Sequence, residues 1–187
     1  MIAKEINDDA LRAHGEKFQR FFGEGQTSVD VIQFLAKSVK TGAWEPNGFE
    51  HAKERAEAAF KAIADGASFD KLREERGEFY MTDDAKGRLG SKALNQLRQS
   101  LHETEFTDLL MGYSAGAYLF YDAEPGTITS PLRGPDGYYV ARVNARTPAH
   151  GAATVDNPRT RELIKQDYVT QRFMDWANGV LAKAVIE

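Results

Sequence analysis

The apolar residues of this chain recur with two periods, one typical of helices and one typical of strands. Helical spacing, with capping residues and closing glycines at the ends, predicts helices over about residues 8–22, 49–65, 68–76 and 157–183. Leucines at helical spacing predict one or two more helices between Ser91 and Met111. Short β-branched runs predict strands over residues 29–36 and 127–129, and a further strand from Tyr138 onward.

The stretch from Glu124 to Arg146 predicts a β-hairpin. Pro125-Gly126 predicts a turn, and residues 134–137 form a Gly-Pro-Asp-Gly loop built from turn residues. Because side chains alternate across a pleated strand, Tyr139, Ala141 and Val143 face one side, and Tyr138, Val140 and Arg142 the other. Both sides carry bulky residues, which predicts a strand in the centre of its sheet.

The predicted C-terminal helix carries an apolar stripe that needs a partner. At about 1.5 Å per residue this helix is about 40 Å long, more than a small domain covers. We expect the N-terminal helix to pack against it through Phe18, Phe21 and Phe22. The stripe consists of Val169, Phe173, Trp176, Val180 and Ala184.

Composition narrows the classes of function. A formal charge of −4 over 187 residues gives no general attraction for nucleic acid or anionic membranes. The chain lacks the run of about 20 apolar residues that membrane insertion requires, and residues 1–9 lack the apolar core of a signal peptide. The absence of cysteine excludes disulfides, thiol catalysis and thiolate metal sites. We expect no metal site, because the histidines are far apart in sequence, at His14, His51, His102 and His150.

Three segments follow one another along the chain: residues 62–72, residues 86–90 and the hairpin at 124–146. Their sequences are AIADGASFDKL, KGRLG and EPGTITSPLRGPDGYYVARVNAR. In this order they resemble the motifs of parvulin-type peptidyl-prolyl cis/trans isomerases. Residues 62–72, AIADGASFDKL, are similar to the family's I-x-x-G-x-x-F-x-x-L segment. Residues 86–90, KGRLG, are close to its G-G-x-L-G loop. The hairpin at 124–146 resembles the family's PG-x-(I/V)-(S/T)-x-P strand, which leads into a G-(Y/I)-H strand. The combination is more specific than any one of the motifs.

The resemblance implies an α+β fold in which helices pack on a small, mostly antiparallel sheet, with flanking helices at both termini. It implies a parvulin-like domain over residues 29–147, between an N-terminal helical segment at 1–28 and a long C-terminal helix at 157–187. The arrangement is similar to bacterial envelope foldases and chaperones with a helical peptide-holding region, which implies the bacterial cell envelope as the location.

One part of the chain departs from the family. Gly90 and Gly126 are 36 positions apart, much further than the corresponding residues of the family. We therefore expect an insertion at about residues 97–119. Within it, residues 112–118 predict an aromatic loop, either a lid over the site or an ordinary surface insertion.

The same resemblance assigns polar site residues by position. The family's first-strand histidine falls at Gln33 and its last-strand histidine at Tyr139, so both histidines are replaced. The position of the family's Cys or Asp falls near Tyr80. We expect Gln33 and Tyr139 to hydrogen-bond to each other across neighbouring strands, since both side chains can donate and accept. The alternative is that each is a buried polar residue whose hydrogen bonds are satisfied elsewhere.

The resemblance also assigns an apolar pocket for the substrate's proline. Leu89 matches one pocket position, while Leu97 and Leu101 fall where the family places a Met and a Phe. Plain core leucines are the alternative for all three residues.

The resemblance implies that the chain isomerises X-Pro bonds of proline-containing polypeptide clients and so assists folding. Rotation about such a bond has a barrier near 20 kcal/mol but breaks no covalent bond, so the reaction requires neither nucleophile nor metal. The resemblance therefore also implies that the chain needs no cofactor. Loss of both histidines favours a second hypothesis, a catalytically impaired parvulin scaffold that serves as a chaperone or protein-interaction module. A third hypothesis is that the terminal helices mediate homodimerisation.

Overall fold

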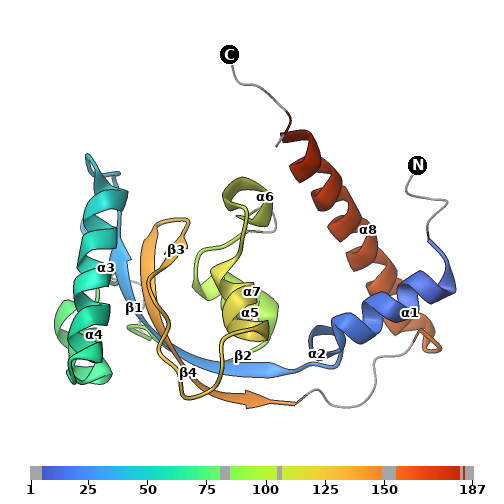
Figure 1. Ribbon diagram of the computed structural model, residues 1–187, viewed down its shortest axis with the longest axis horizontal. Helices are drawn as coiled ribbons and strands as arrows, with labels where there is room; N and C mark the ends of the chain where they lie inside the picture. The colour runs from blue at the N-terminus through green and yellow to red at the C-terminus, as the bar shows by residue number, and fades with distance from the viewer. Residues whose placement is uncertain (1–5, 81–84, 105–106, 149–154, 182, 184–187) are drawn as a thin grey trace. The chain divides into compact units, whose positions relative to one another are not determined.

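The computed structural model describes residues 6–80, 85–104, 107–148, 155–181 and 183. The chain forms two compact units, the first from residues 1–25, 106–113 and 147–187, and the second from residues 26–105 and 114–146. The second unit contains the sheet and the helices packed on it (Figure 1). Its elements are β1 (Gln26–Leu35), α3 (Gly48–Ala64), α4 (Phe69–Arg76), β2 (Arg88–Lys92), α5 (Leu94–Ser100), α7 (Ala115–Tyr121), β3 (Leu132–Gly134) and β4 (Gly137–Thr147).

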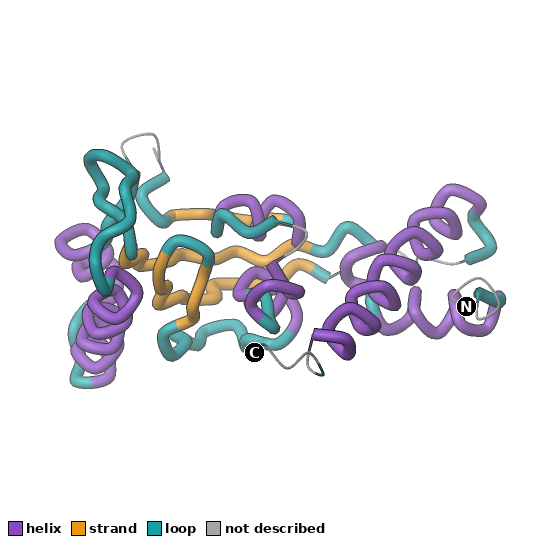
Figure 2. Tube along the Cα trace, turned by 90° about the horizontal axis from the view of Figure 1, so that it is seen from above, coloured by secondary structure: helices purple, strands orange, loops and turns teal. Residues whose placement is uncertain are grey.

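The sheet has four strands in the order β2-β1-β4-β3, which lie side by side in Figure 2. β1 pairs with β2 and β3 with β4, both antiparallel. The end of β1 meets the start of β4, because Ala36 N donates to Asp136 O, while Asp30 and Arg142 bond further along. Residue numbers fall along β1 as they rise along β4, so these two central strands are antiparallel as well. The predicted central position of the last strand is confirmed, as is the α+β class, but residues 127–129 form only a single bridge, from Ile128 to Arg142.

Helices α3 and α4 cover one face of the sheet and α5 and α7 the other (Figure 1). The α3 face receives the even-numbered residues of β1, Ile32 and Phe34, together with Val140 of β4. They pack against Ala52, Ala56 and Ala59 of α3 and against Phe69 and Leu72 of α4. Since neighbours on a strand face opposite sides, Gln33 and Tyr139 lie on the face that α5 and α7 cover.

Caps fix the ends of these helices as the sequence predicted. The Ser68 side chain accepts a hydrogen bond from Lys71 N at the start of α4. Gly66, which follows α3, has a φ of +100°, a conformation that glycine adopts without steric cost.

Helix α7 corrects the prediction of a loop over residues 112–118. It begins at Ala115, after the N-cap residue Ser114, whose hydroxyl accepts from Ala117 N at 2.9 Å. Glu103 lies buried at the same end of the helix and accepts from Ser114 Oγ at 2.5 Å and from Ala115 N at 2.7 Å. This carboxylate supplies the acceptors that the first backbone amides of a helix need.

The first unit consists of four helices among its described residues: α1 (Asp8–Lys17), α2 (Gln19–Phe22), α6 (Thr107–Met111) and α8 (Pro158–Leu181). The two terminal helices pack together as predicted, but the core between them is Leu11, Val155 and Ile164, and of the three predicted phenylalanines it is Phe22 that packs against this core. His14 Nε2 and Asp167 Oδ2 add a contact of 2.7 Å between α1 and α8. Asn157 caps α8 through bonds from Arg159 N and Thr160 N. None of the helices in the described ranges is long and apolar enough to cross a membrane.

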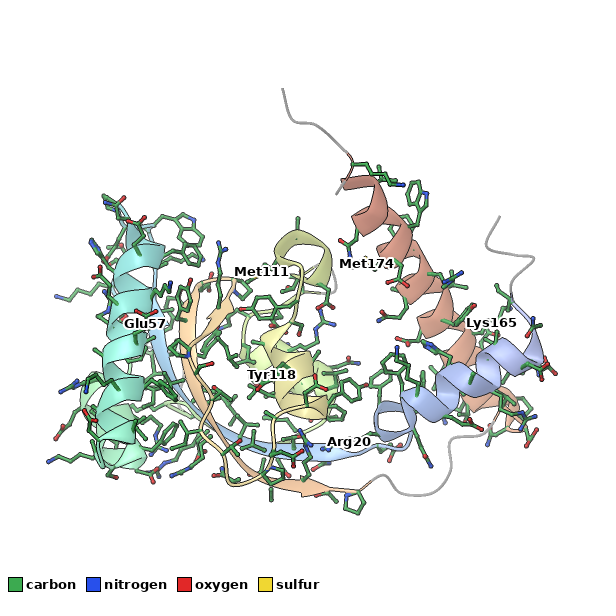
Figure 3. The ribbon with its side chains drawn as sticks, in the orientation of Figure 1. Arg20, Glu57, Met111, Tyr118, Lys165 and Met174 are labelled. Carbon is green, nitrogen blue, oxygen red and sulfur yellow. The ribbon has the colours of Figure 1, made fainter. Side chains whose placement is uncertain are left out.

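The predicted apolar stripe is not the face of α8 that packs in this unit. Phe173 is 43% exposed and Trp176 62%, whereas Ile164 and Met174 are buried. Met174 and Lys165, labelled in Figure 3, lie on the buried and the exposed sides of the helix. Ala184, the last residue of the predicted stripe, lies outside the described residues.

Glu103 generates a prediction about stability. Burial raises the pKa of Glu103 above its ordinary value, against the opposing effect of the hydrogen bonds from Ser114, Gly116 and Ala115. The folded state therefore holds the Glu103 proton more tightly than the unfolded state, and the contribution of this group to stability is lost as pH rises through the raised pKa. We expect the difference in unfolding free energy, wild type minus Glu103→Gln, to decrease as pH rises from about 4 to 8. Urea denaturation across that range measures it, and a difference that grows with pH would contradict the prediction.

Candidate functional site

The two positions that the resemblance assigns to the family's histidines lie opposite each other in the sheet. Ala36 N donates to Asp136 O, and a Cβ added to Gly137 would lie 3.0 Å from Leu35 Cα. Counting three residues along each antiparallel strand from Ala36 and Asp136 brings Gln33 opposite Tyr139. Both side chains face the α5 and α7 layer, and both are buried.

The hydrogen bond predicted between these two residues is not formed. The Tyr139 hydroxyl instead donates to the Leu101 carbonyl oxygen at 2.9 Å. Gln33 Nε2 is buried and has no hydrogen-bond partner within the described part of the chain. The Tyr139 ring also packs so closely on Gly134 that a Cβ at that position would collide with it. Tyr139 therefore belongs to the core of the domain.

The three predicted pocket leucines do not form a common exposed surface. Leu97 and Leu101 have no solvent exposure. Leu89 is half-buried and lies at an irregularity of β2, where Val29 pairs with Gly90 and Asp30 with Arg88. For Leu97 and Leu101 the structure has the arrangement of ordinary core leucines.

Tyr80, the third predicted polar residue, lies in a cluster of hydrogen-bonding side chains around Asp136. Its hydroxyl is 3.4 Å from Asp136 Oδ2, and His102 Nδ1 is 3.0 Å from the same oxygen. Lys37 Nζ donates to the other carboxylate oxygen, Oδ1, at 2.5 Å. We call Lys37, Tyr80, His102 and Asp136 the Asp136 cluster.

Four separate segments build this cluster. Asp136 lies in the turn between β3 and β4, and Lys37 follows the end of β1. Glu78 N donates to Gln33 O, and the Glu78 carboxylate accepts from Leu35 N, so the segment that carries Tyr80 lies along the end of β1. His102 follows α5. The cluster is partly exposed, with 39% of the His102 side chain and 14% of the Asp136 side chain open to solvent.

The carboxylate of Asp136 contributes to a raised pKa of the Tyr80 hydroxyl. Burial, followed by the charge of Asp136 and the hydrogen bond to it, raises the pKa of Tyr80 to about 12. Tyr80 is therefore a neutral donor at physiological pH. It can give a hydrogen bond but does not act as a base.

Aromatic residues continue the cluster on one side. Lys37 Nζ lies 4.2 Å from the centroid of the Trp44 ring, and the Trp44 ring stacks on Phe49 at 5.6 Å. A bridge between Lys37 and Trp44 holds this loop in place. Trp44 is nevertheless 58% exposed. The site thus places an exposed aromatic residue beside a group of polar side chains.

Three members of the cluster, Lys37, His102 and Asp136, are not predicted from the sequence pattern. Asp136 fits an ordinary turn residue, no motif includes Lys37, and His102 is only one of four scattered histidines. A carboxylate in the turn of the hairpin that carries the family motif was the one signal for the site, since Asp136 is three residues before Tyr139.

Comparison with solved structures finds similar chains, each at low identity. A PpiC-type peptidyl-prolyl cis-trans isomerase domain is 19% identical, with a TM-score of 0.45, over 69% of this chain and 97% of that one. A peptidylprolyl isomerase, PrsA, from Bacillus anthracis is 12% identical, with a TM-score of 0.46, over 95% of this chain and 71% of that one. A structure of SurA-like chaperones from Campylobacter jejuni is 16% identical, with a TM-score of 0.38, over 97% of this chain and 64% of that one. No family model and no curated protein matches the sequence. The similar structures are of the kind that the three motifs resemble, and identities this low assign no activity to the chain.

The bond between Tyr139 and Leu101 predicts a stability effect. Replacing Tyr139 with Phe leaves the buried Leu101 carbonyl without this donor, so we expect the variant to lose about 1–3 kcal/mol of unfolding free energy. Gln33→Leu is the matched control on the opposite strand, because it removes an amide whose Nε2 has no hydrogen-bond partner in the described structure. Urea denaturation of both variants measures the difference. Equal losses in the two variants would contradict the assignment.

The Asp136 cluster predicts the titration of Tyr80. Because its folded pKa is raised, the stability that neutral Tyr80 contributes is present below pH 10 and is lost as pH rises toward 12. Asp136→Asn removes the neighbouring charge, so the pKa of Tyr80 is expected to fall, although it stays above its ordinary value because burial remains. Nuclear magnetic resonance of ring-labelled tyrosine, assigned with Tyr80→Phe, measures the change. An unaltered titration in Asp136→Asn would refute the role of that charge.

Proposed function

We propose that this chain is a parvulin-like domain that binds X-Pro segments of other polypeptides, accelerates their cis/trans isomerisation and so assists folding. The sequence motifs support the class of reaction. The observation that supports the site is the Asp136 cluster, in which Tyr80 lies with three further hydrogen-bonding side chains at the hairpin turn. An isomerase needs to steady a twisted imide and to exclude water from it, and hydrogen-bond donors beside apolar surface suit both tasks.

The cluster offers the two kinds of contact that a proline-containing segment uses. Trp44, exposed beside Lys37, provides aromatic surface of the kind on which prolines pack in other recognition domains. His102 and Tyr80 carry polar atoms that face Asp136 and are partly open to solvent. We propose that the substrate lies across these residues, and not over Gln33 and Tyr139.

Burial of the predicted pocket favours a second candidate function, a scaffold that binds polypeptides without isomerising them. Leu97, Leu101 and Tyr139 are closed off from solvent and are therefore unable to receive a prolyl ring without rearrangement. Such a scaffold keeps unfolded chains from aggregating but leaves the rate of X-Pro rotation unchanged.

One experiment separates the two functions. Exchange nuclear magnetic resonance on a panel of Xaa-Pro peptides is expected to show faster cis/trans exchange with the folded protein than without it. Asp136→Asn is expected to lower that acceleration, whereas Glu57→Gln, which removes a carboxylate on the exposed surface of α3 (labelled in Figure 3), is expected to leave it unchanged. If the folded protein accelerates no peptide but still suppresses aggregation of an unfolded client, the scaffold function holds and the isomerase proposal fails.

A further inference from the structure

His102 has one ring nitrogen, Nδ1, held by a carboxylate, and within the described part of the chain its Nε2 makes no hydrogen bond. His102 Nδ1 lies 3.0 Å from Asp136 Oδ2, and the ring centroid lies 5.6 Å from that of Tyr80. The residue is exposed, with 39% of its side chain open to solvent. Among the described residues, the charged and titratable groups in contact with this arrangement are Asp136 and Tyr80, with Lys37 on the far oxygen of the same carboxylate.

The backbone at His102 has the conformation that glycine normally supplies. Helix α5 ends in a Schellman motif, in which His102 N donates to Gln99 O and Glu103 N donates to Arg98 O. His102 occupies the position after the C-cap, with a φ of +59°. Glycine is the usual residue there because a side chain in the left-handed region is sterically costly. The backbone conformation at the end of α5 therefore does not explain why this residue is a histidine.

Tyr139 holds the residue that precedes His102. Its hydroxyl donates to the Leu101 carbonyl, which belongs to the peptide group that joins Leu101 to His102. Asp136, three residues before Tyr139 on the same hairpin, holds the His102 ring. The hairpin thus fixes both the backbone and the side chain of His102. Tyr139, at a position where the family has a histidine, therefore helps to position His102, a histidine from another part of the chain.

The hydrogen bonds around Asp136 determine what the ring presents to solvent. An ionised carboxylate only accepts, so Nδ1 must donate to it. Lys37 and Tyr80 occupy the carboxylate as further donors and restrict its rotation. With Nδ1 protonated, a neutral ring has an acceptor at Nε2, whereas a positively charged ring has a second N–H there.

We propose that His102 is the catalytic residue that touches the substrate, and that its charged form donates a hydrogen bond from Nε2 to the carbonyl oxygen of the residue before proline. This inference rests on the proposed isomerase function and names the group that serves it. A peptide carbonyl accepts and never donates, so only the charged ring fits. No bond is made or broken, and the proton stays on Nε2 while the imide rotates. The interaction lowers the barrier as far as it is stronger in the twisted imide than in the planar one.

The test compares two substitutions at His102 with a control elsewhere. Asparagine tolerates the left-handed region and has a donor within reach of Asp136, while glycine is the residue that the helix end prefers. We expect both His102→Asn and His102→Gly to lower the catalysed rate of Xaa-Pro exchange roughly 10-fold or more, because a hydrogen bond from a charged donor is lost. His102→Gly is expected to be as resistant to urea as the wild type, or more so. His51→Gln, an exposed histidine on α3, is expected to change neither quantity.

The pH dependence distinguishes a donor from a merely structural histidine. Catalysis by the wild type is expected to fall with rising pH, because only the charged ring carries an N–H at Nε2 to donate. The fall is expected to vanish in His102→Asn and to persist in His51→Gln. If the wild type catalyses exchange but the two His102 variants match it in rate and pH profile, the inference about His102 is overturned and the isomerase function stands. If the wild type does not catalyse exchange at any pH, both fail.

Discussion

The hydrogen bond from the Tyr139 hydroxyl to the Leu101 carbonyl is the interaction on which the candidate site depends. It joins residues 38 positions apart and is fully buried, so neither group has water as an alternative partner. Through it the β3-β4 hairpin is fastened to the end of α5. The hairpin turn provides Asp136, and the end of α5 provides His102. Their side chains come within hydrogen-bonding distance because the Tyr139 bond holds the hairpin against the end of this helix. A change in how the hairpin packs would therefore alter the polar surface above it.

Local chemistry predicted most of the fold. Asn157, Ser68 and Gly66 each act within a few residues of their own position, and the structure places the corresponding helix ends where the sequence indicated. Helix α7 was missed because its first turn is stabilised by Glu103, a residue outside the segment whose pattern was interpreted. The sequence pattern predicts the wrong face of α8, because the helix has apolar residues on two sides and periodicity does not decide which side packs.

The sequence predicts the positions of some residues of the candidate site but not the partners of their side chains. Matching the chain to family motifs placed Gln33 and Tyr139 on neighbouring strands, but it carried no information on the partners of their side chains. The hydroxyl of Tyr139 was bound elsewhere, and the amide nitrogen of Gln33 had no hydrogen-bond partner in the described structure. Asp136 and His102 are 34 positions apart, and each fits an ordinary local role, in a turn and after a helix. Only the packed layers bring such a pair together, so no local pattern reveals it.

The exposure of the tryptophans has a practical consequence for spectroscopy. Trp44 and Trp176, the chain's two indoles, are 58% and 62% exposed, and they belong to different units. Because their surroundings are already largely aqueous, their fluorescence emission maximum is expected to shift little when the chain unfolds. The same exposure makes quenching by a small solute such as acrylamide a sensitive reporter of anything that covers either indole. A protein with one such probe in each unit allows a ligand to be assigned to one of them by replacing the other tryptophan with phenylalanine.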